Sequence, residues 1–586
     1  MGSHHLKLVR GGLYRTPLSL LEMQDPAVHR KSWDLGYHHA KRGKEAEPDN
    51  PAVGDQQGYI DGYRARQRET GEQGRGGQGG GQPAPGGRPE QDIEPTMRLP
   101  LHDVPKTVGQ VTAAVAAAGG RGLLIGGAVR DKLMGKTPKD FDIEVYGLHP
   151  DKLEQVLGTL GQVDAVGKSF GVLKIVIGDE DFDVSVPRRE SKTGAGHKGF
   201  IPVPDPSMTI KEAARRRDFT MNTVAMDPHT GDVFDPYNGV QDLQDRVLRA
   251  TDPSAFAEDP LRILRGAQFA ARFDMTVDPE TMKLMQQASP ELVDLPVERV
   301  GAEWRKLLMK GEKPSMGMEV MKQAGVLKAL HPELDAMEDT PQDAEWHPEG
   351  NVWIHTKMVA DRATELTRGM PPETQEAVRY AAVMHDISKP QDTFTDDNGR
   401  IRSPRHEENG GRVVSEIFRR QFDVSKELAD KVAKLTADHL KPQVFFLQRD
   451  TLTDGAIRRL AGRLAPATIG ELVLTAHADH TGRGENGPKD FPAGDWLMKK
   501  AEELQVDKEP VKPILMGRHL MDMGMKPSPM IGDVLRKVFD MQVDGKVHDL
   551  ASAQAAAQQL IQAGPQREWL GREQLNLLAD GPLGRA

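Results

Sequence analysis

Two aspartates, Asp140 and Asp142, follow a glycine pair, Gly126–Gly127, that comes directly after the apolar run Leu123–Ile125. A glycine turn can expose backbone N–H groups to a triphosphate. If the aspartates lie on a strand, both carboxylates share one face, because strand side chains alternate. Two carboxylates on one face can hold the Mg²⁺ ions of a two-metal phosphoryl or nucleotidyl transfer. The pattern therefore predicts a protein that binds a nucleoside triphosphate and moves its α-phosphate onto a hydroxyl.

Two further stretches carry groups that can bind a nucleotide. The segment 215–225 places arginines beside a carboxylate and an amide, and guanidinium groups match phosphate oxygens bidentately. Pro260 suits the first turn of a helix, so Asp259 would lie near a helix start with Arg262 one turn further on. One acceptor and one guanidinium on neighbouring positions can read the edge of a base.

This ordered set of motifs, from about residue 122 to 275, resembles the class II tRNA nucleotidyltransferase and bacterial poly(A) polymerase family. The resemblance implies that Asp140 and Asp142 are the catalytic carboxylates, which bind Mg²⁺. It assigns the other roles as follows: triphosphate contacts to Gly127 and Arg130, sugar and phosphate contacts to Arg217 and Asp218, selection of C or A to Asp259 and Arg262, and a nucleotide contact to Arg265. A third carboxylate would fall at Asp183, where solvation of a hairpin explains an aspartate equally well.

One position departs from the pattern of that family. Many members carry a further arginine where this chain has Gln268, one turn after Arg265. The loss of this charge leaves nucleotide affinity and base choice open, but not the class of reaction.

A second set of residues is typical of a metal centre. His385 and Asp386 are adjacent at the end of an apolar segment, and both are costly to bury without a partner. A metal ion would satisfy both side chains. Together with His355 and Asp479 they form a nitrogen and oxygen ligand set that suits Mg²⁺, Mn²⁺, Ni²⁺ or Fe better than structural zinc.

This order of residues resembles the H…HD…D pattern of the HD phosphohydrolase superfamily, with His355, His385, Asp386 and Asp479 as its metal ligands. His406 and His439 fall where some members add ligands for a second metal. The resemblance implies a metal-dependent phosphatase or 2′,3′-cyclic phosphodiesterase that could repair RNA ends before extension. A degenerate HD fold without hydrolytic activity is the alternative.

The remaining chain must position these two constellations, and we expect a multidomain α+β protein with a polymerase-β-like head. Its expected parts are a small helical module (1–66), a flexible Gly- and Gln-rich linker (67–97), a nucleotidyltransferase head (98–240), a helical neck and RNA-binding region (241–335), an HD domain (336–485) and a helical tail (486–586). In the head we expect strands at 123–125 and 140–146 and a hairpin over 172–186. The first module carries the aromatic and glycine pattern of Trp33–Tyr37 and Gly58–Arg64. Over about 35 residues it resembles ribosome modulation factor, which implies a ribosome partner; a helical hairpin with no ribosome role is the alternative.

Composition limits the other possibilities. The 586 residues include no cysteine, which excludes disulfides and thiolate zinc sites. The net charge of −10 argues against an RNA binder that is basic over its whole surface, but not against a local groove such as one around Arg215–Arg217. We find no signal peptide and no apolar run long enough to span a membrane, so we expect a cytoplasmic protein with no membrane partner.

The motifs leave more than one function open. We expect template-independent addition of CCA to tRNA 3′ ends from CTP and ATP. Poly(A) addition to another RNA 3′ end shares every motif named above. A chain that is mainly an HD phosphohydrolase with an inactive head is an alternative of another class, as is a ribosome-associated binding protein. The expected cofactors are Mg²⁺ at the head, and a divalent transition metal or Mg²⁺ at the HD site.

Overall fold

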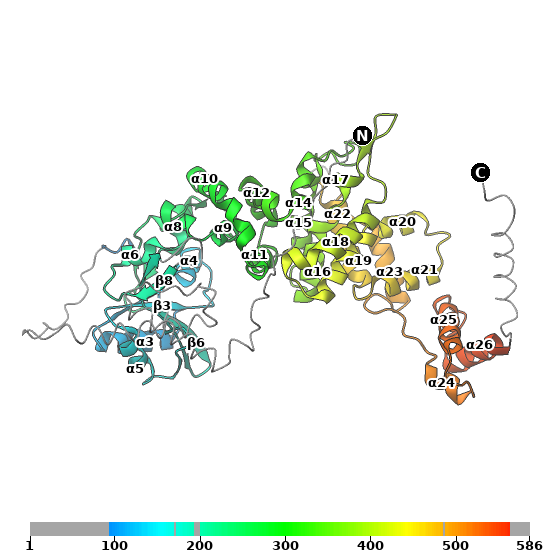
Figure 1. Cartoon of the computed structure of the whole chain (residues 1–586), viewed down its shortest axis with the longest axis horizontal. Coiled ribbons are helices and arrows are strands. Elements are labelled where there is room, and N and C mark those ends of the chain that lie inside the picture. Colours follow the sequence, from blue (N-terminus) through cyan, green and yellow to red (C-terminus); the bar gives the residue numbers. More distant parts are fainter. Residues whose placement is uncertain (1–92, 169–170, 193–199, 485–486, 563–586) are drawn as a thin grey trace, which may run out of the picture. The chain divides into compact units, whose positions relative to one another are not determined.

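The computed structural model describes residues 93–168, 171–192, 200–484 and 487–562, all within one compact unit, Arg88–Ala586. In chain order this unit comprises an α/β head, a run of neck helices, the helices around His385 and a small helical tail (Figure 1). The predicted module 1–66 lies outside the described residues, as does the linker up to residue 92.

The head is built on an eight-stranded mixed sheet, of order β1-β10-β9-β2-β3-β6-β5-β4. Neighbouring strands pair antiparallel except β3 and β6, which are parallel. The strands are β1 (Met97–Arg98), β2 (Arg121–Ile125), β3 (Asp142–Tyr146), β4 (Gln162–Asp164), β5 (Val172–Ile177), β6 (Glu180–Ser185), β9 (Ala225–Met226) and β10 (Asp232–Phe234). A separate pair joins β7 (Arg188–Lys192) to β8 (Phe200–Pro204).

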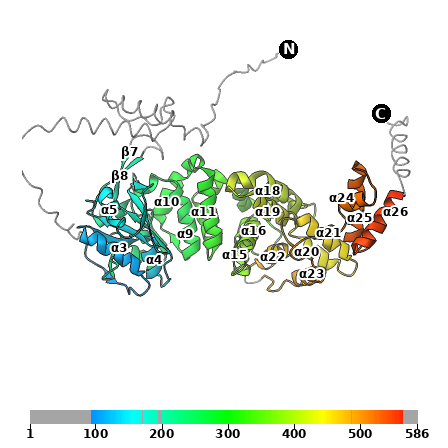
Figure 2. The same cartoon turned by 90° about the horizontal axis from the view of Figure 1, so that it is seen from below.

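Helices cover this sheet because its strands carry apolar side chains on both faces. Ile143 and Val145 of β3 pack with α3 (Lys106–Ala117) and α5 (Pro150–Leu157), which lie side by side (Figure 1, Figure 2). Leu123 of β2 and Tyr146 of β3 belong to a second hydrophobic cluster, which includes Ile210 of α6 (Ile210–Arg215). The remaining head helices are α4 (Gly127–Leu133), η4 (Thr220–Asn222) and α7 (Gly239–Gln244).

The strand predicted at 140–146 is shorter than expected. It begins at Asp142, which pairs with Ile125, the last residue of β2. The chain then turns at Gly126, whose φ of +64° favours glycine, so no partner strand continues beside Asp140. Asp140 therefore lies in the loop before β3, and the expectation that both aspartates are strand residues was wrong. The strand at 123–125 and the hairpin over 172–186 are confirmed.

Beyond the head the described chain is almost entirely helical. The neck contains α8 (Pro253–Ala257), α9 (Leu261–Phe273), α10 (Pro279–Ala288), η5 (Ser289–Asp294), α11 (Val297–Lys310), α12 (Pro314–Gln323), α13 (Val326–Leu330), α14 (Pro332–Asp335) and η6 (Ala336–Asp339). The next region contains α15 (Val352–Leu366), α16 (Pro372–Met384), α17 (Lys389–Asp392), α18 (His406–Phe422), α19 (Lys426–Asp438), α20 (Lys441–Leu447), α21 (Asp454–Leu464), α22 (Ile469–Thr481) and α23 (Pro492–Glu503). The tail contains α24 (Gly517–Asp522), α25 (Pro529–Val543) and α26 (Leu550–Gln562). Two small strand pairs complete these regions: β11 (Val247–Leu248) with β12 (Thr276–Val277), and β13 (Phe394–Thr395) with β14 (Ile401–Arg402).

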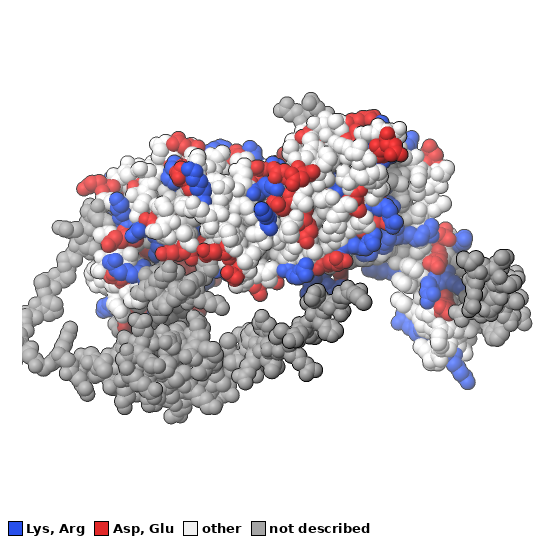
Figure 3. Space-filling model, turned by 45° about the horizontal axis from the view of Figure 1, so that its top comes forward, with Lys and Arg blue, Asp and Glu red and all other residues white. Residues whose placement is uncertain are grey.

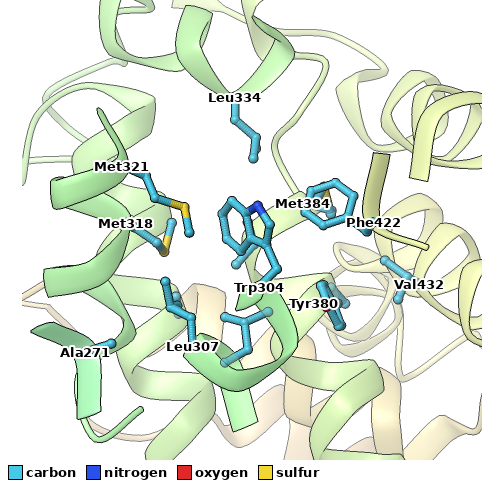
Figure 4. Packing of buried hydrophobic residues seen from close by; sticks show 14 of the residues in the cluster. Ala271, Trp304, Leu307, Met318, Met321, Leu334, Tyr380, Met384, Phe422 and Val432 are labelled. Atoms are coloured by element: carbon cyan, nitrogen blue, oxygen red, sulfur yellow. The ribbon is translucent and has the colours of Figure 1, made fainter. Parts of the chain in front are cut away.

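One hydrophobic core joins the neck to the helices that follow it. Trp304 of α11 is fully buried and packs edge-on against Phe422 of α18, with 5.3 Å between ring centroids (Figure 4). Gly301 lies so close to the carbonyl of Phe422 that no side chain fits between them. The buried guanidinium of Arg379 on α16 donates to the carbonyl of Leu308, 2.8 Å away, near the end of α11. The neck therefore shares its interior with the following domain.

Charge is mixed over the surface. On the face shown in Figure 3, basic and acidic side chains are interspersed, as the modest net charge suggests. Among the described residues, no helix is long and apolar enough to cross a membrane.

Candidate active sites

The predicted nucleotide-binding residues converge on one cavity of about 820 Å³ between the head and the neck. Its lining includes Gly127, Arg130, Asp140, Asp142, Arg217, Asp218, Asp259, Arg262, Arg265 and Gln268. Residues of η4 and of α11 complete the wall. The geometry thus brings together motifs that are more than a hundred residues apart in the chain.

Three aspartates form the acidic part of this site. Asp142 is the register partner of Asp183 on the parallel strand β6, and Asp140 lines a neighbouring cavity with both. Partial removal from bulk water raises the pKa of Asp142, and the negative charge of Asp183 raises it further. A bound divalent cation would relieve this accumulation of negative charge, so Asp140, Asp142 and Asp183 fit the expected Mg²⁺ ligands.

Asp218 and Arg265 form a half-buried ion pair at the wall of the cavity. Arg265 Nη2 lies 2.6 Å from Asp218 Oδ2, and Asp218 Oδ1 also accepts from the side-chain amide of Asn222 at 2.9 Å and from the backbone N–H of Phe219 at 2.8 Å. Burial alone would raise the pKa of Asp218, but these partners hold it below its ordinary value. The carboxylate therefore stays ionised and fixes the orientation of the guanidinium.

Asn222 and Glu144 are two site residues that the sequence interpretation did not assign. Asn222 accepts from Arg130 Nη1 at 2.8 Å through its side chain and from Arg217 Nη1 at 2.8 Å through its backbone carbonyl. Glu144 is buried, accepts from the Tyr146 hydroxyl at 2.6 Å and lies 3.3 Å from Arg217 Nη2. Glu144 stands two residues after Asp142 on β3, and this spacing is the signal that could have found it.

Asp259 and Arg262 lie at the start of α9, as the Pro260 pattern predicts. Asp259 accepts from the backbone N–H of Leu261 at 3.1 Å. Arg262 donates to the backbone carbonyl of Ala255 and, at 2.6 Å, to that of Arg216. These bonds hold the guanidinium in place and use two of its five N–H donors, which leaves the others for the edge of a base.

The predicted metal ligands of the second site also come together. Nε2 of His355 on α15 lies 3.1 Å from Asp479 Oδ1 of α22, and these two residues form one group of candidate ligands with His385. Asp386 forms a second group with His406 and His439.

Buried polar atoms at this site are left without hydrogen bonds. His385 Nε2 and both carboxylate oxygens of Asp386 lack a partner of acceptable geometry, although Lys389 Nζ lies 2.8 Å from Asp386 Oδ2. The Nδ1 atoms of His385, His406 and His439 lie 2.7 to 2.9 Å from backbone carbonyls, which leaves each Nε2 available to a metal. Such unsatisfied atoms are costly in a protein interior, and a divalent metal ion would satisfy them.

The charges around Asp386 and Asp479 keep both residues ionised. Burial alone would raise the pKa of each carboxyl, but hydrogen bonds and electrostatic interactions with neighbouring side chains hold both well below the ordinary value. For Asp386 these groups are His385 and Lys389, and for Asp479 they include His355. Ionised carboxylates and imidazole nitrogens are suitable ligands for Mg²⁺ or a divalent transition metal.

His347 and Glu349 extend this site beyond the predicted ligands. Glu349 Oε1 lies 2.7 Å from His355 Nδ1 and 3.0 Å from His347 Nδ1. A carboxylate on the far nitrogen of a ligand histidine fixes the ring and its tautomer. These residues lie eight and six positions before His355 in the sequence, which did not by itself predict a role for them.

Known families match three stretches of the chain. Residues 123–249 match the poly(A) polymerase head domain, residues 274–338 match the probable RNA- and SrmB-binding site of polymerase A, and residues 352–483 match the HD domain. None of these matches reaches residues 1–66, and the comparisons give no support to a ribosome partner.

Solved structures show a similar fold. The CCA-adding enzyme of Bacillus stearothermophilus, solved with CTP, aligns with a TM-score of 0.54 at 19% identity, covering 79% of this chain and 98% of that enzyme. A CCA-adding enzyme solved with ATP aligns with a TM-score of 0.51 at 18% identity, covering 78% of this chain and 95% of that enzyme. The predicted class, a polymerase-β-like head followed by helical regions and an HD domain, is confirmed.

Two curated relatives are more similar in sequence. The multifunctional CCA protein of Stenotrophomonas maltophilia strain R551-3 is 37% identical over 64% of this chain and 89% of the relative. The protein of the same name from Vibrio vulnificus strain YJ016 is 37% identical over 65% of this chain and 89% of the relative. The chain therefore belongs to the family of multifunctional CCA proteins, nucleotidyltransferases that combine a poly(A) polymerase head with an HD domain.

Proposed function

We propose that this protein adds C, C and A to the 3′ end of tRNA, using CTP and ATP as substrates. The observation that carries the proposal is the single cavity that joins the acidic residues, the glycine turn and the Asp259–Arg262 pair. The name of the curated relatives, multifunctional CCA protein, supports CCA as the added sequence. The resemblance of the head motifs to tRNA nucleotidyltransferases favours tRNA as the acceptor. The family description of residues 274–338 supports an RNA-binding role for the predicted neck.

In the proposed reaction, the 3′-hydroxyl of the RNA attacks the α-phosphate of the nucleotide. A bond forms between this oxygen and phosphorus, the bond to pyrophosphate breaks, and the hydroxyl proton is released. Asp140 and Asp142, with Asp183 as the third carboxylate, would hold Mg²⁺, which when bound lowers the pKa of the hydroxyl and stabilises the leaving group.

The arginines of the site bind the phosphates in this proposal. Arg130 and Arg217 are held in place by Asn222, and Arg265 is held by Asp218, so the protein preorganises their donors before the substrate arrives. Gly127 allows close approach of the triphosphate, while Asp259 and Arg262 select the base.

An extension assay tests this proposal directly. A tRNA that lacks CCA is incubated with the full chain, CTP, ATP and Mg²⁺, and the products are separated at single-nucleotide resolution. Addition that stops after three residues supports CCA synthesis. Long A tracts made from ATP alone would support the alternative, poly(A) addition. Failure to extend any RNA would favour the third possibility, an HD phosphohydrolase with an inactive head.

We also propose that the HD site hydrolyses phosphate esters at RNA ends, such as a 2′,3′-cyclic phosphate. The unsatisfied buried atoms of His385 and Asp386 favour an intact metal centre over a degenerate one. The test is hydrolysis of an RNA that ends in a 2′,3′-cyclic phosphate, with Mg²⁺, Mn²⁺ or Ni²⁺ added to metal-free protein. Absence of product with every metal would identify a degenerate site.

The expected cytoplasmic location also stays a prediction.

A further inference from the structure

We propose that Arg272 binds a phosphate group of a substrate in the head cavity. This inference rests on the proposed nucleotidyltransferase function and adds a residue to its substrate-binding site. Arg272 lies in the last turn of α9 and lines the same cavity as Arg265 and Asp142.

The ion pairs of the cavity distinguish Arg272 from its neighbours. Arg130 lies 2.8 Å from Asp131, Arg217 lies 3.3 Å from Glu144, and Arg265 lies 2.6 Å from Asp218. Arg272 has no carboxylate partner within the described part of the chain. Its one hydrogen bond, at 3.4 Å, goes to the neutral side chain of Gln268.

Aromatic rings hold the Arg272 guanidinium close to another positive charge. It lies 4.9 Å from the ring centroid of Phe273, and the guanidinium of Arg130 lies 4.6 Å from the same ring. Partial burial lowers the pKa of Arg272 and repulsion from Arg130 lowers it further, while the carboxylates of Asp131 and Glu303 offset part of this shift. Two like charges beside one ring repel each other, and a bound anion would remove this repulsion.

The spacing along α9 places Arg272 beside Gln268 at the cavity wall. Gln268 and Arg272 are four residues apart, so they share one face of the helix. The Gln268 side chain is only 2% exposed, whereas Arg272 is half-buried at the cavity wall. A phosphate bound here can come from the nucleoside triphosphate or from the RNA backbone, since both present the same oxyanion.

Binding measurements on an Arg272→Gln variant test the proposal and identify the source of the phosphate. The Kd for CTP is measured by calorimetry without RNA, and the Kd for tRNA lacking CCA is measured by filter binding without nucleotide. We expect one of these affinities to fall by roughly tenfold to a hundredfold, the range for a lost hydrogen bond to a charged group. A weaker Kd for CTP assigns the triphosphate, and a weaker Kd for tRNA assigns the backbone.

Two further variants make the result specific. Arg272→Lys keeps the positive charge but loses the bidentate geometry, so its affinity should fall between those of the wild-type chain and Arg272→Gln. Arg246→Gln is the matched control, because Arg246 is exposed, pairs with Asp274 at 2.8 Å and does not line the cavity. Both affinities should be unchanged in this control.

The proposal is overturned if folded Arg272→Gln protein binds both CTP and tRNA with wild-type affinity. Circular dichroism establishes that the variant is folded, and if it is not, the Arg272→Lys variant decides by the same measurements. Failure of the proposed function would be seen in another measurement, the extension assay, where the wild-type chain would extend no tRNA.

Discussion

The two candidate sites of this chain differ in how far their charged side chains are buried and in how completely these side chains are hydrogen-bonded. In the head, Asp140 and Asp142 are exposed to a cavity of about 820 Å³, and most of its arginines are paired with protein acids or carbonyls. At the HD site, His355 and His385 are fully buried and Asp386 is 1% exposed, with polar atoms left unsatisfied.

This difference follows from the size of what each site accommodates. An open cavity with paired charges remains stable while empty, and it can admit a nucleotide together with an RNA end. A buried cluster with unsatisfied atoms carries a free-energy cost while it is empty, and a small positive ion would lower that cost. The head cavity thus has room for a large substrate, whereas the buried HD cluster suits a single ion.

The comparison breaks if the two sites depend on each other for activity. Asp142→Asn should reduce nucleotide incorporation into tRNA by at least about 10³-fold, because metal stabilisation of the transition state contributes several kcal/mol. Hydrolysis of a 2′,3′-cyclic phosphate should keep its wild-type rate. Incorporation at the wild-type rate would mean that Asp142 is not a catalytic ligand.

Asp386→Asn should give the reverse pattern. Hydrolysis should fall by about 10³-fold or more, since Asp386 carries one of the two negative charges of the ligand set. Extension of tRNA by CTP and ATP should be unaffected. The same two assays serve, and a parallel loss of extension would show that the sites are coupled.

Acid should weaken the junction between the neck and the HD domain. Burial lowers the pKa of His331 from 6.5 to about 4, and its neutral ring accepts from Trp304 Nε1 at 2.9 Å and contacts Gln421 at 3.0 Å. The unfolded chain binds the proton more readily, so this stabilisation is complete above pH 6.5 and is lost as the pH falls towards 4. The loss should total about 3 kcal/mol.

Urea unfolding between pH 7 and pH 4.5 measures this effect, with His331→Gln as the comparison. The variant has no titrating ring at this position, so its stability should fall less steeply over the same range. If the free energy of unfolding falls equally steeply with pH in the two proteins, His331 is not the group responsible.

Metal should stabilise the HD site more than the head. Adding Mn²⁺ to metal-free protein at a hundred times its Kd should stabilise the domain that binds it by about 2.7 kcal/mol. This stabilisation is measured as an increase in melting temperature on adding Mn²⁺. The Asp386→Asn variant should lose most of the increase, whereas Asp142→Asn should keep it. An equal loss in both variants would remove the contrast between an exposed and a buried site.

The smallest expected effect concerns the helix contact that joins the two regions. Gly301→Ala should destabilise the protein by about 1–3 kcal/mol, because the new methyl group would meet the carbonyl of Phe422. Gly532→Ala is the control: no atom lies within 4 Å of the new methyl group in α25, so the variant should gain roughly 0.5–1 kcal/mol. Thermal unfolding of both variants provides the measurement.

The sequence predicted the head motifs well because each is local. The glycine turn, β3 and the Pro260 helix start are encoded within a few residues, and their order carried the resemblance to a known family. Asp140 was misplaced because its strand pairing depends on where β2 ends, which is set by the backbone turn at Gly126.

Other features depend on contacts between distant parts of the chain. Glu144 and Arg217 meet only because β3 lies beside the segment that follows α6, and no spacing within one motif reveals this pair. Arg272 gained significance only when the structure showed which arginines already have acidic partners. The sequence identified side chains able to do chemistry. Which of these arginines are paired with acidic residues was visible only in the three-dimensional structure.

The shared interior around Trp304 and Arg379 also bears on how this protein can be divided or recombined. The family matches end and begin again between residues 338 and 352, which suggests a natural point of separation. Cutting there would expose an indole ring and leave the carbonyl of Leu308 without its guanidinium donor. The HD domain is thus not an interchangeable cassette, because removing it would open the interior that it shares with the neck.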